Sequence, residues 1–531
     1  MRIRRSLLNF ATMVLFTVVT MAVALVATPW LETWLGRERF GAFRILFDCL
    51  GYLTLLELGL GGALSPLIAR ALGRGDEPAL RKTVAVGTRA YLSVSILTVV
   101  VGLALVPVIP RFVADLPPRY LPDLRMAWVV GLSGFLSLSL LPFRTVLDAR
   151  QLGYRINLLM VAQSLLITGV ALVLARGGWG ITGQSIAHAL GTWFVTLAMA
   201  GVALRVHPGL LRSARAESGD RETLRAIWRL SLPTLLFNLS GRVSLMTDNI
   251  VVGAMLGAGT VTTLFFTQRL AVLAQSLLQG VGGATWAALA ELHAKGEHNT
   301  FNSRLIELSG LIALLSVAGL APIVGFNRSF LGLWRGPSYP YGGDAVIALA
   351  ALNAFLQSQF SLWAWCFTAT GKAPRIVANS VLASVVNLAA SLLLTPWLGM
   401  AGPLLGTTFA FVAVVGWWLP RALQRDFGTS PTALARAVLP SLAFGLPYAA
   451  GLVRLARWHP PRSWFELSAL MSLSALAVLA LGFASRLRDP EQRALWHVRL
   501  RGLRPASQPV VFAGTESKPA GPTDGFGRTP S

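Results

Sequence analysis

Two stretches of this chain repeat one pattern of glycines and charges, and they decide its architecture. The first, residues 57–76, reads ELGLGGALSPLIARALGRGD, and the second, residues 278–297, reads LQGVGGATWAALAELHAKGE. At the offset of 221 residues (278 minus 57), the charged turn Arg74-Gly75-Asp76 falls on Lys295-Gly296-Glu297. Chance similarity between apolar helices would not hold glycines and a charged turn in one register. We therefore predict an internal duplication.

Matches also occur further along, with slightly shorter offsets. Arg155 matches Arg375, and the glycines of 180–183 match those of 399–402. Six predicted helices separate the equivalent elements, so both halves should have the same membrane orientation. The axis that relates them should lie along the membrane normal. A paired structure of this kind predicts a central cleft between two lobes that rock against each other.

The composition places the chain in a membrane. Of its 531 residues, 54% are hydrophobic and 13% are charged, whereas a soluble domain carries about 25% charged residues. The charges gather in short gaps between long apolar stretches, as in a chain whose solvent is lipid. The net charge of +23 sits at the ends of apolar segments and not on one amphipathic face, so we expect no nucleic-acid partner.

A membrane-spanning helix needs about twenty apolar residues, and fourteen segments qualify. The sequence therefore predicts an all-α polytopic membrane protein of about fourteen helices. The first segment could instead be a signal peptide, but its apolar run is too long for one. The predicted spans are Leu8–Leu31, Phe40–Leu64, Val84–Ile109, Met126–Leu147, Ile156–Leu174, Ile181–Leu204, Leu230–Leu256, Val261–Leu289, Leu305–Leu331, Ala345–Thr370, Ile376–Trp397, Ala401–Leu419, Leu434–Val453 and Leu467–Phe483.

Arginine and lysine fall mainly in alternate gaps, and this asymmetry predicts the orientation. The basic gaps are the N-terminus and the gaps after the second, fourth, sixth, tenth and twelfth spans. We therefore expect both termini in the cytoplasm. One gap disagrees, because Arg454, Arg457 and Arg462 fall on the predicted outer side.

The spans divide the chain into five predicted parts. These are an N-terminal six-helix lobe (1–204), a basic cytoplasmic linker (205–229), a C-terminal six-helix lobe (230–424), two extra helices (425–488) and a tail (489–531). The tail is rich in Pro, Gly, Ser and Arg, so we expect it to be disordered.

The second predicted span and the turn after it carry short motifs of a known superfamily. They contain Arg39-Phe40-Gly41, Glu57-Leu-Gly59-Leu-Gly61 and Gly73-Arg-Gly75-Asp76. In these motifs the chain resembles the oligosaccharide-lipid (O-antigen or polysaccharide) flippases of the multidrug/oligosaccharidyl-lipid/polysaccharide exporter superfamily. Glu57 stands where that family usually has Asp.

The resemblance implies two V-shaped lobes around a cavity and alternating access. It implies transport of a polyprenyl-pyrophosphate-linked oligosaccharide across the bacterial cytoplasmic membrane, for polysaccharide or lipopolysaccharide synthesis. Membrane lipid, the lipid-linked oligosaccharide, and glycan polymerases or glycosyltransferases are the expected partners of a monomeric protein. Fourteen spans also occur in peptidoglycan-precursor (lipid II) flippases, so the substrate stays open.

Charged residues inside the spans are the candidate site residues, because a charge at bilayer depth costs at least about 2.5–3.5 kcal/mol. Arg44 and Asp48 lie one turn apart in the second span and either pair with each other or line the cavity. At the repeat offset Asp48 corresponds to Arg269, so we expect these two residues on opposite walls of one cavity. An arginine there could bind pyrophosphate bidentately.

The seventh predicted span carries a polar stripe of Asn238, Arg242 and Asn249. These residues lie within about 60° of one another on a helix, so they should face the cavity or hydrogen-bond to neighbouring helices. Asp248 points elsewhere and is the candidate for coupling to H+ or Na+, with Asp48 as the other. No other cofactor and no metal is expected.

Three further residues near the end of the second span, Glu57, Gly59 and Gly61, are predicted to have a gating or structural role. His188 is expected to be a packed histidine rather than a proton relay.

Two other functions compete with the flippase. A cation-coupled multidrug antiporter of the same superfamily should have an acidic cavity, whereas arginines are at least as prominent here. A membrane glycosyltransferase or polymerase would need acidic motifs, and no Asp-x-Asp occurs in the sequence. We therefore expect no enzymatic activity. The lack of a Walker A motif also predicts that ATP is not the direct energy source.

Overall fold

The computed structural model describes residues 2–57, 60–210 and 247–487, and within them the chain is helical without strands. The first part contains α1 (Arg2–Leu35), α2 (Arg37–Leu53), α3 (Leu60–Arg74), α4 (Glu77–Ala104), α5 (Leu121–Ser133), α6 (Leu141–Ala149), α7 (Gly153–Arg176) and α8 (Gly180–Val206). After the helix Thr247–Leu256 come α10 (Ala258–Ala294), α11 (His298–Arg335), α12 (Asp344–Ala369), α13 (Pro374–Leu398), α14 (Ala401–Ala410), α15 (Gly416–Phe427), α16 (Pro431–Trp458) and α17 (Trp464–Leu487).

The prediction of an all-α polytopic membrane protein is confirmed. Among the described residues, twelve helical segments are long and apolar enough to cross a membrane, and each coincides with a predicted span. The count of fourteen is not established. The predicted span Phe40–Leu64 is divided between α2 and α3, and most of Leu230–Leu256 lies outside the described residues.

The second predicted span is therefore not one continuous α-helix. A 3-10 turn, η1 (Thr54–Glu57), follows α2, and the Thr54 hydroxyl donates to the Gly51 carbonyl oxygen at 2.7 Å. The glycines that follow have low helix propensity. The Tyr91 hydroxyl of α4 holds the Glu57 carboxylate from the side, at 2.7 Å. The low helix propensity of these glycines and the contact of Glu57 with Tyr91 together account for the interruption of the helix after Leu53.

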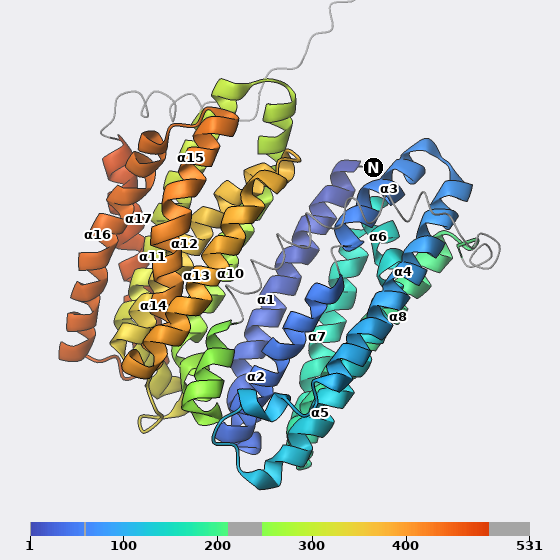
Figure 1. Ribbon diagram of the computed structural model, residues 1–531. Helices are drawn as coiled ribbons and strands as arrows, with labels where there is room; N and C mark the ends of the chain where they lie inside the picture. Colours follow the sequence, from blue (N-terminus) through green and yellow to red (C-terminus); the bar gives the residue numbers. More distant parts are fainter. Residues whose placement is uncertain (1, 58–59, 211–246, 488–531) are drawn as a thin grey trace, which may run out of the picture. The chain divides into compact units, whose positions relative to one another are not determined.

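The helices pack mainly with others near them in the chain (Figure 1). The helix α7 packs on α1 and α8, and α8 also packs on α5. Further along, α10 packs on α11 and α12, α11 on α16, and α13 on α14. The main contact between these two sets is that of α2 with α10.

A glycine permits the contact of α2 with α10. A Cβ atom on Gly41 would lie 1.8 Å from the carbonyl oxygen of Ala258 and 2.9 Å from the Thr262 hydroxyl oxygen. The Thr262 hydroxyl donates to the Arg37 carbonyl oxygen at 2.7 Å, which ties the starts of both helices together. Gly41 belongs to the Phe-Gly motif, so this motif serves close packing.

The backbone repeats its geometry at the offsets that the sequence predicts. Three pairs of glycines with positive φ occupy equivalent positions in the two halves. One pair precedes α2 and α10, a second follows α3 and α10, and in the third pair one glycine begins α8 and the other follows α13. The pairs are Gly36 (81°) with Gly257 (88°), Gly75 (69°) with Gly296 (76°), and Gly180 (56°) with Gly399 (56°).

The described residues up to Leu479 belong to one compact unit, and the second unit begins at Ala480. All sites described below lie in the first unit. Of the predicted linker 205–229 only the part up to residue 210 is described, and the predicted tail 489–531 lies outside the described residues.

Candidate functional site: a cavity lined by arginines

A cavity of about 340 Å³ lies among α1, α2, α7, α8 and α10. The helix α1 contributes mostly apolar side chains to its wall, including Phe16 and Val23. Threonine and serine hydroxyls line it as well, and the larger polar side chains, which come from the other helices, are Arg44, Gln163, Gln184, His188 and Arg269. A mostly apolar cavity with a few polar side chains is typical of a binding site for an organic molecule.

Two arginines flank one aromatic ring at this cavity. The guanidinium carbon of Arg44 lies 4.7 Å from the centre of the Phe265 ring, and that of Arg269 lies 5.1 Å from it. Both side chains are half-buried. Arg269 follows Phe265 by one turn on α10, and Arg44 follows Gly41 by about one turn on α2. The close crossing of α2 and α10 therefore brings the two arginines together.

Both guanidinium groups contact Phe265, and Arg44 also acts on the charge of Asp48 one turn along α2, but neither has a hydrogen-bond acceptor or an ion pair among the described residues. The Nε atom of each is shielded from solvent and has no hydrogen-bond acceptor, and no ion pair involves either group in this part of the chain. The two positive charges also act on each other across the cavity. An anion between them would relieve that repulsion and accept hydrogen bonds that are otherwise unmade.

Asp48 does not line this cavity. Its buried carboxylate accepts a hydrogen bond from the Asn249 amide at 2.7 Å and forms no ion pair among the described residues. The structure thus joins two predicted site residues, Asp48 and Asn249, but it places Arg44 and not Asp48 beside Arg269. The repeat offset relates equivalent positions of the two halves, and equivalent positions need not share a cavity. Asn238 and Arg242 lie outside the described residues.

Asp248 lies in a second polar cluster. It lies beside Thr407 of α14, and its Oδ1 atom is shielded from solvent without a hydrogen-bond partner. The Thr407 hydroxyl donates to Asn387 Oδ1 of α13 at 3.1 Å, and Ser391 donates to the same oxygen at 3.1 Å. Asp248 thus brings a carboxylate to a group of neutral oxygen atoms.

Glu57 lies away from the cavity, where the Tyr91 hydroxyl donates to it. A Cβ atom on Gly61 would lie 3.2 Å from that hydroxyl and 3.3 Å from the Glu57 carboxylate, so the glycine leaves room for the contact. Gly59 lies outside the described residues.

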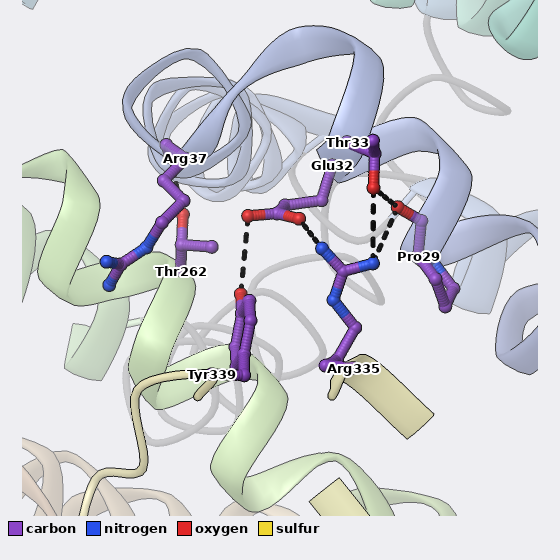
Figure 2. Close-up of polar contacts among 7 residues, drawn as sticks. All are labelled: Pro29, Glu32, Thr33, Arg37, Thr262, Arg335 and Tyr339. Carbon is purple, nitrogen blue, oxygen red and sulfur yellow. Dashed lines mark hydrogen bonds and ion pairs between the residues drawn. The ribbon is translucent and has the colours of Figure 1, made fainter. Parts of the chain in front are cut away.

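A buried ion pair ties α1 to α11, and it was not anticipated from the sequence. Figure 2 shows Arg335 paired with Glu32, which is 3% exposed. The same guanidinium donates to the Pro29 carbonyl oxygen at 2.9 Å. Burial raises the pKa of Tyr339, so its hydroxyl stays protonated and donates to Glu32 at 3.4 Å. The one feature of the sequence that could have indicated this ion pair is the carboxylate of Glu32, near the end of the long first apolar segment.

Arg37 adds a contact beside this cluster. Its guanidinium donates to the Thr263 hydroxyl of α10 at 2.6 Å. Polar contacts thus join the end of α1 to the end of α11 (Figure 2). Others join the start of α2 to the start of α10.

The cavity residues missed by sequence reasoning are Gln163, Gln184 and Phe265. An uncharged amide or an aromatic ring in an apolar helix gives little sequence signal. His188 lines the cavity but packs on Phe47, with 4.2 Å between the ring centres, in keeping with the expected packed histidine.

Comparisons with known proteins agree with this architecture. The pattern of the family described as "Polysaccharide biosynthesis protein" matches residues 6–293. A Bacillus subtilis (strain 168) protein, the uncharacterized membrane protein EpsK, is 21% identical over 463 residues, covering 82% of this chain and 86% of its own.

Solved structures with the same fold are membrane transporters. The lipid II flippase MurJ, in an inward closed conformation, has a TM-score of 0.69 at 12% identity, covering 90% of this chain and 99% of its own. An inward-facing multidrug resistance MATE family transporter of the MOP superfamily has a TM-score of 0.58 at 16% identity, covering 82% of this chain and 99% of its own. The resemblance expected from the motifs of the second span is confirmed.

Proposed function

Because the chain belongs to the family of polysaccharide biosynthesis proteins and shares its fold with transporters of the MOP superfamily, we propose that it is a flippase for a polyprenyl-pyrophosphate-linked oligosaccharide. The observation that carries the proposal is the pair of arginines, Arg44 and Arg269, that share one cavity and have no hydrogen-bond or ion-pair partner among the described residues.

The chemistry of this pair favours a phosphate-bearing ligand. Guanidinium groups bind phosphate oxygens through parallel hydrogen bonds, and they are desolvated more readily than an ammonium group. Two of them close together match the two linked phosphates of a pyrophosphate. Gln163 offers its amide to sugar hydroxyls, Gln184 offers its unpartnered Oε1 atom, and the apolar side chains of α1 can pack against carbon atoms.

Transport would proceed by alternating access. The contacts of Glu32, Arg37 and Arg335 join α1 and α2 to α10 and α11 at one end of the molecule. Release of the oligosaccharide at that end would require these contacts to break. We place that end on the outer side of the bacterial cytoplasmic membrane, with both termini in the cytoplasm, as the arginine pattern predicts.

Ion coupling is assigned to Asp248. A carboxylate beside the oxygen atoms of Thr407 and Asn387 suits either a proton or Na+. Occupation of this group would alter the packing of α13, α14 and the helix Thr247–Leu256. The proposed partners are the membrane, the lipid-linked oligosaccharide, and the glycosyltransferases or polymerase that precede and follow it.

Two other substrates are supported by specific observations. The similarity to the lipid II flippase MurJ favours a peptidoglycan precursor. The similarity to a MATE family transporter, together with the buried Asp48 and Asp248, favours a drug cation exchanged for H+ or Na+. Neither Asp48 nor Asp248 lines the cavity that holds the arginines, so we favour an anionic substrate.

The test is the glycan chemistry of a deletion strain. We expect loss of surface glycan and accumulation of the lipid-linked oligosaccharide, both reversed by the wild-type gene and by Arg304→Ala. Arg304 is exposed and pairs with Glu307 outside the cavity, which makes it a matched control. Arg269→Ala should insert normally but restore little glycan.

Other outcomes would redirect the assignment. Accumulation of a peptidoglycan precursor with normal surface glycan would identify a lipid II flippase. Normal pools of both precursors with increased drug accumulation would identify the antiporter.

A further inference from the structure

A second groove, of about 370 Å³, lies between later helices of the chain. Its walls come from α11, α12 and α16, none of which lines the arginine cavity. Along most of its length the lining is apolar, with small side chains such as Ala321, Ala351 and Ala449. This groove is therefore separate from the cavity proposed for the transported substrate, and its ligand has to be inferred from its own lining.

Helix packing explains why the groove is there. A Cβ atom on Gly445 would lie 2.8 Å from Val317, and one on Gly325 would lie 2.5 Å from Leu452. These glycines bring α16 close against α11. The helix α12 also packs on α11, but among the described helices α12 and α16 share no comparable contact. The space between α12 and α16 is left open, with α11 as its floor.

Charged side chains lie at one end of the groove only. They are Asp344, which begins α12, and Arg454 and Arg457, which are in the last turns of α16. Arg457 forms an ion pair with Asp344, and Arg328 also acts on the charge of that carboxylate. Arg454 is exposed and has no partner in the described part of the chain. Among the lining residues, two arginines against one carboxylate leave this end positive.

The length of the groove matches one leaflet of a membrane. Leu442 and Arg457 line its two ends and are 15 residues apart (457 minus 442), which corresponds to about 22 Å along a helix. Half of a bilayer, headgroups included, is about 20–22 Å thick. Trp458 and Phe465 are 88% and 85% exposed beside the charged end, as expected of aromatic side chains at the membrane surface.

We propose that this groove is a binding site for an anionic phospholipid of the outer leaflet. One acyl chain lies along the apolar walls, and the phosphate group binds Arg454 and Arg457. The site explains why arginines occur at this end of α16, on the side that the charge pattern assigns to the outside. The leaflet follows from the proposed orientation, whereas the binding chemistry requires neither that orientation nor flippase activity.

Native mass spectrometry of the purified full-length protein in detergent tests the proposal. Phosphatidylglycerol is titrated in, and phosphatidylcholine serves as the zwitterionic comparison. We expect saturable binding of phosphatidylglycerol and weaker binding of phosphatidylcholine. Arg454→Gln should weaken phosphatidylglycerol about fivefold, since one arginine at a membrane surface contributes about that factor. This substitution leaves the ion pair of Arg457 in place.

Two further variants separate the groove from charge alone. Arg462→Gln removes an exposed arginine near the same end of α16 but outside the groove, and it should bind phosphatidylglycerol as the wild type does. Ala449→Phe fills the groove without changing charge and should weaken both lipids. Equal weakening by Arg454→Gln and Arg462→Gln would overturn the site. Unchanged lipid binding by the Ala449→Phe variant would also overturn the site. Displacement of phosphatidylglycerol by an equal concentration of a polyprenyl phosphate would overturn it as well.

Discussion

At the scale of single residues, the ion pair of Glu32 and Arg335 is the contact most open to test. Both groups are shielded from water, with side chains 4% and 11% exposed. Removing one partner of such a pair leaves the other charge buried without compensation, which costs about 3–5 kcal/mol. That cost falls on the conformation in which α1 and α11 are joined, and not on one in which they have separated.

Glu32→Gln should therefore favour the conformation that is open at this end. We expect a cysteine placed in the cavity, Ser164→Cys, to react with an impermeant maleimide from that side at least roughly a hundredfold faster in the Glu32→Gln background. The native Cys49 and Cys366 are buried, so background labelling should be low. An Arg304→Gln background is the matched control. Equal labelling in all backgrounds would mean that the pair does not hold this end closed.

Sequence reasoning singled out Arg44 and Arg269 as candidates because charges inside apolar segments are rare and need a reason. It could not find their shared contact with Phe265, which depends on how α2 and α10 cross. It also expected Asp48 opposite Arg269, because the repeat was read as a guide to contact. Glu32 was overlooked because a carboxylate near the end of a span can lie at the membrane surface at little cost.

At the scale of helices, the crossing of α2 and α10 depends on the missing side chain of Gly41. Gly41→Ala would place a methyl group against the Ala258 carbonyl oxygen, and overpacking of this kind costs about 1–3 kcal/mol. We expect a lower melting temperature in detergent and a lower level of the protein in the membrane.

Gly73→Ala is the control for that substitution. Gly73 is a helical glycine of α3 with open space where a Cβ atom would lie, so alanine should be neutral or slightly stabilising. A Gly41→Ala variant that melts at or above the wild-type temperature would show that α2 and α10 tolerate a wider separation.

Helix boundaries illustrate what the sequence can and cannot provide at this scale. Apolar length alone predicted the twelve spans that the structure describes, because lipid leaves few alternatives to a helix. The interruption at Thr54–Glu57 was missed, because glycines weaken a helix without deciding where it breaks. The contact of Glu57 with Tyr91, distant in the chain, was needed as well.

At the scale of the whole molecule, the orientation in the membrane is open to a direct test. The helix α11 has exposed positions near both ends, Asn299 in its first turn and Ser338 just after its last. The arginine pattern predicts that Ser338→Cys reacts with an impermeant reagent added outside intact cells. Asn299→Cys should react only after the membrane is opened. The reverse result would invert the proposed orientation and place the Arg335 contacts on the cytoplasmic side.

The duplication links the sequence to the whole fold. Glycines 221 residues apart, Gly36 and Gly257, have nearly the same backbone angle before equivalent helices, with φ of 81° and 88°. The sequence predicted this relation because only glycine adopts that conformation readily. The substrate could not be predicted in the same way, since it depends on side chains that the repeat does not conserve between halves, such as Arg44.

The most direct test of the central claim is transport by purified protein in vesicles. A fluorescent polyprenyl-pyrophosphate oligosaccharide would be placed in one leaflet, and its arrival in the other would be followed by quenching. We predict transport by the wild type and by Arg304→Ala, and a loss of about tenfold or more in Arg44→Ala and Arg269→Ala. Equal transport by all four proteins, or no transport by a folded wild type, would contradict the proposal that the two arginines carry a lipid-linked oligosaccharide.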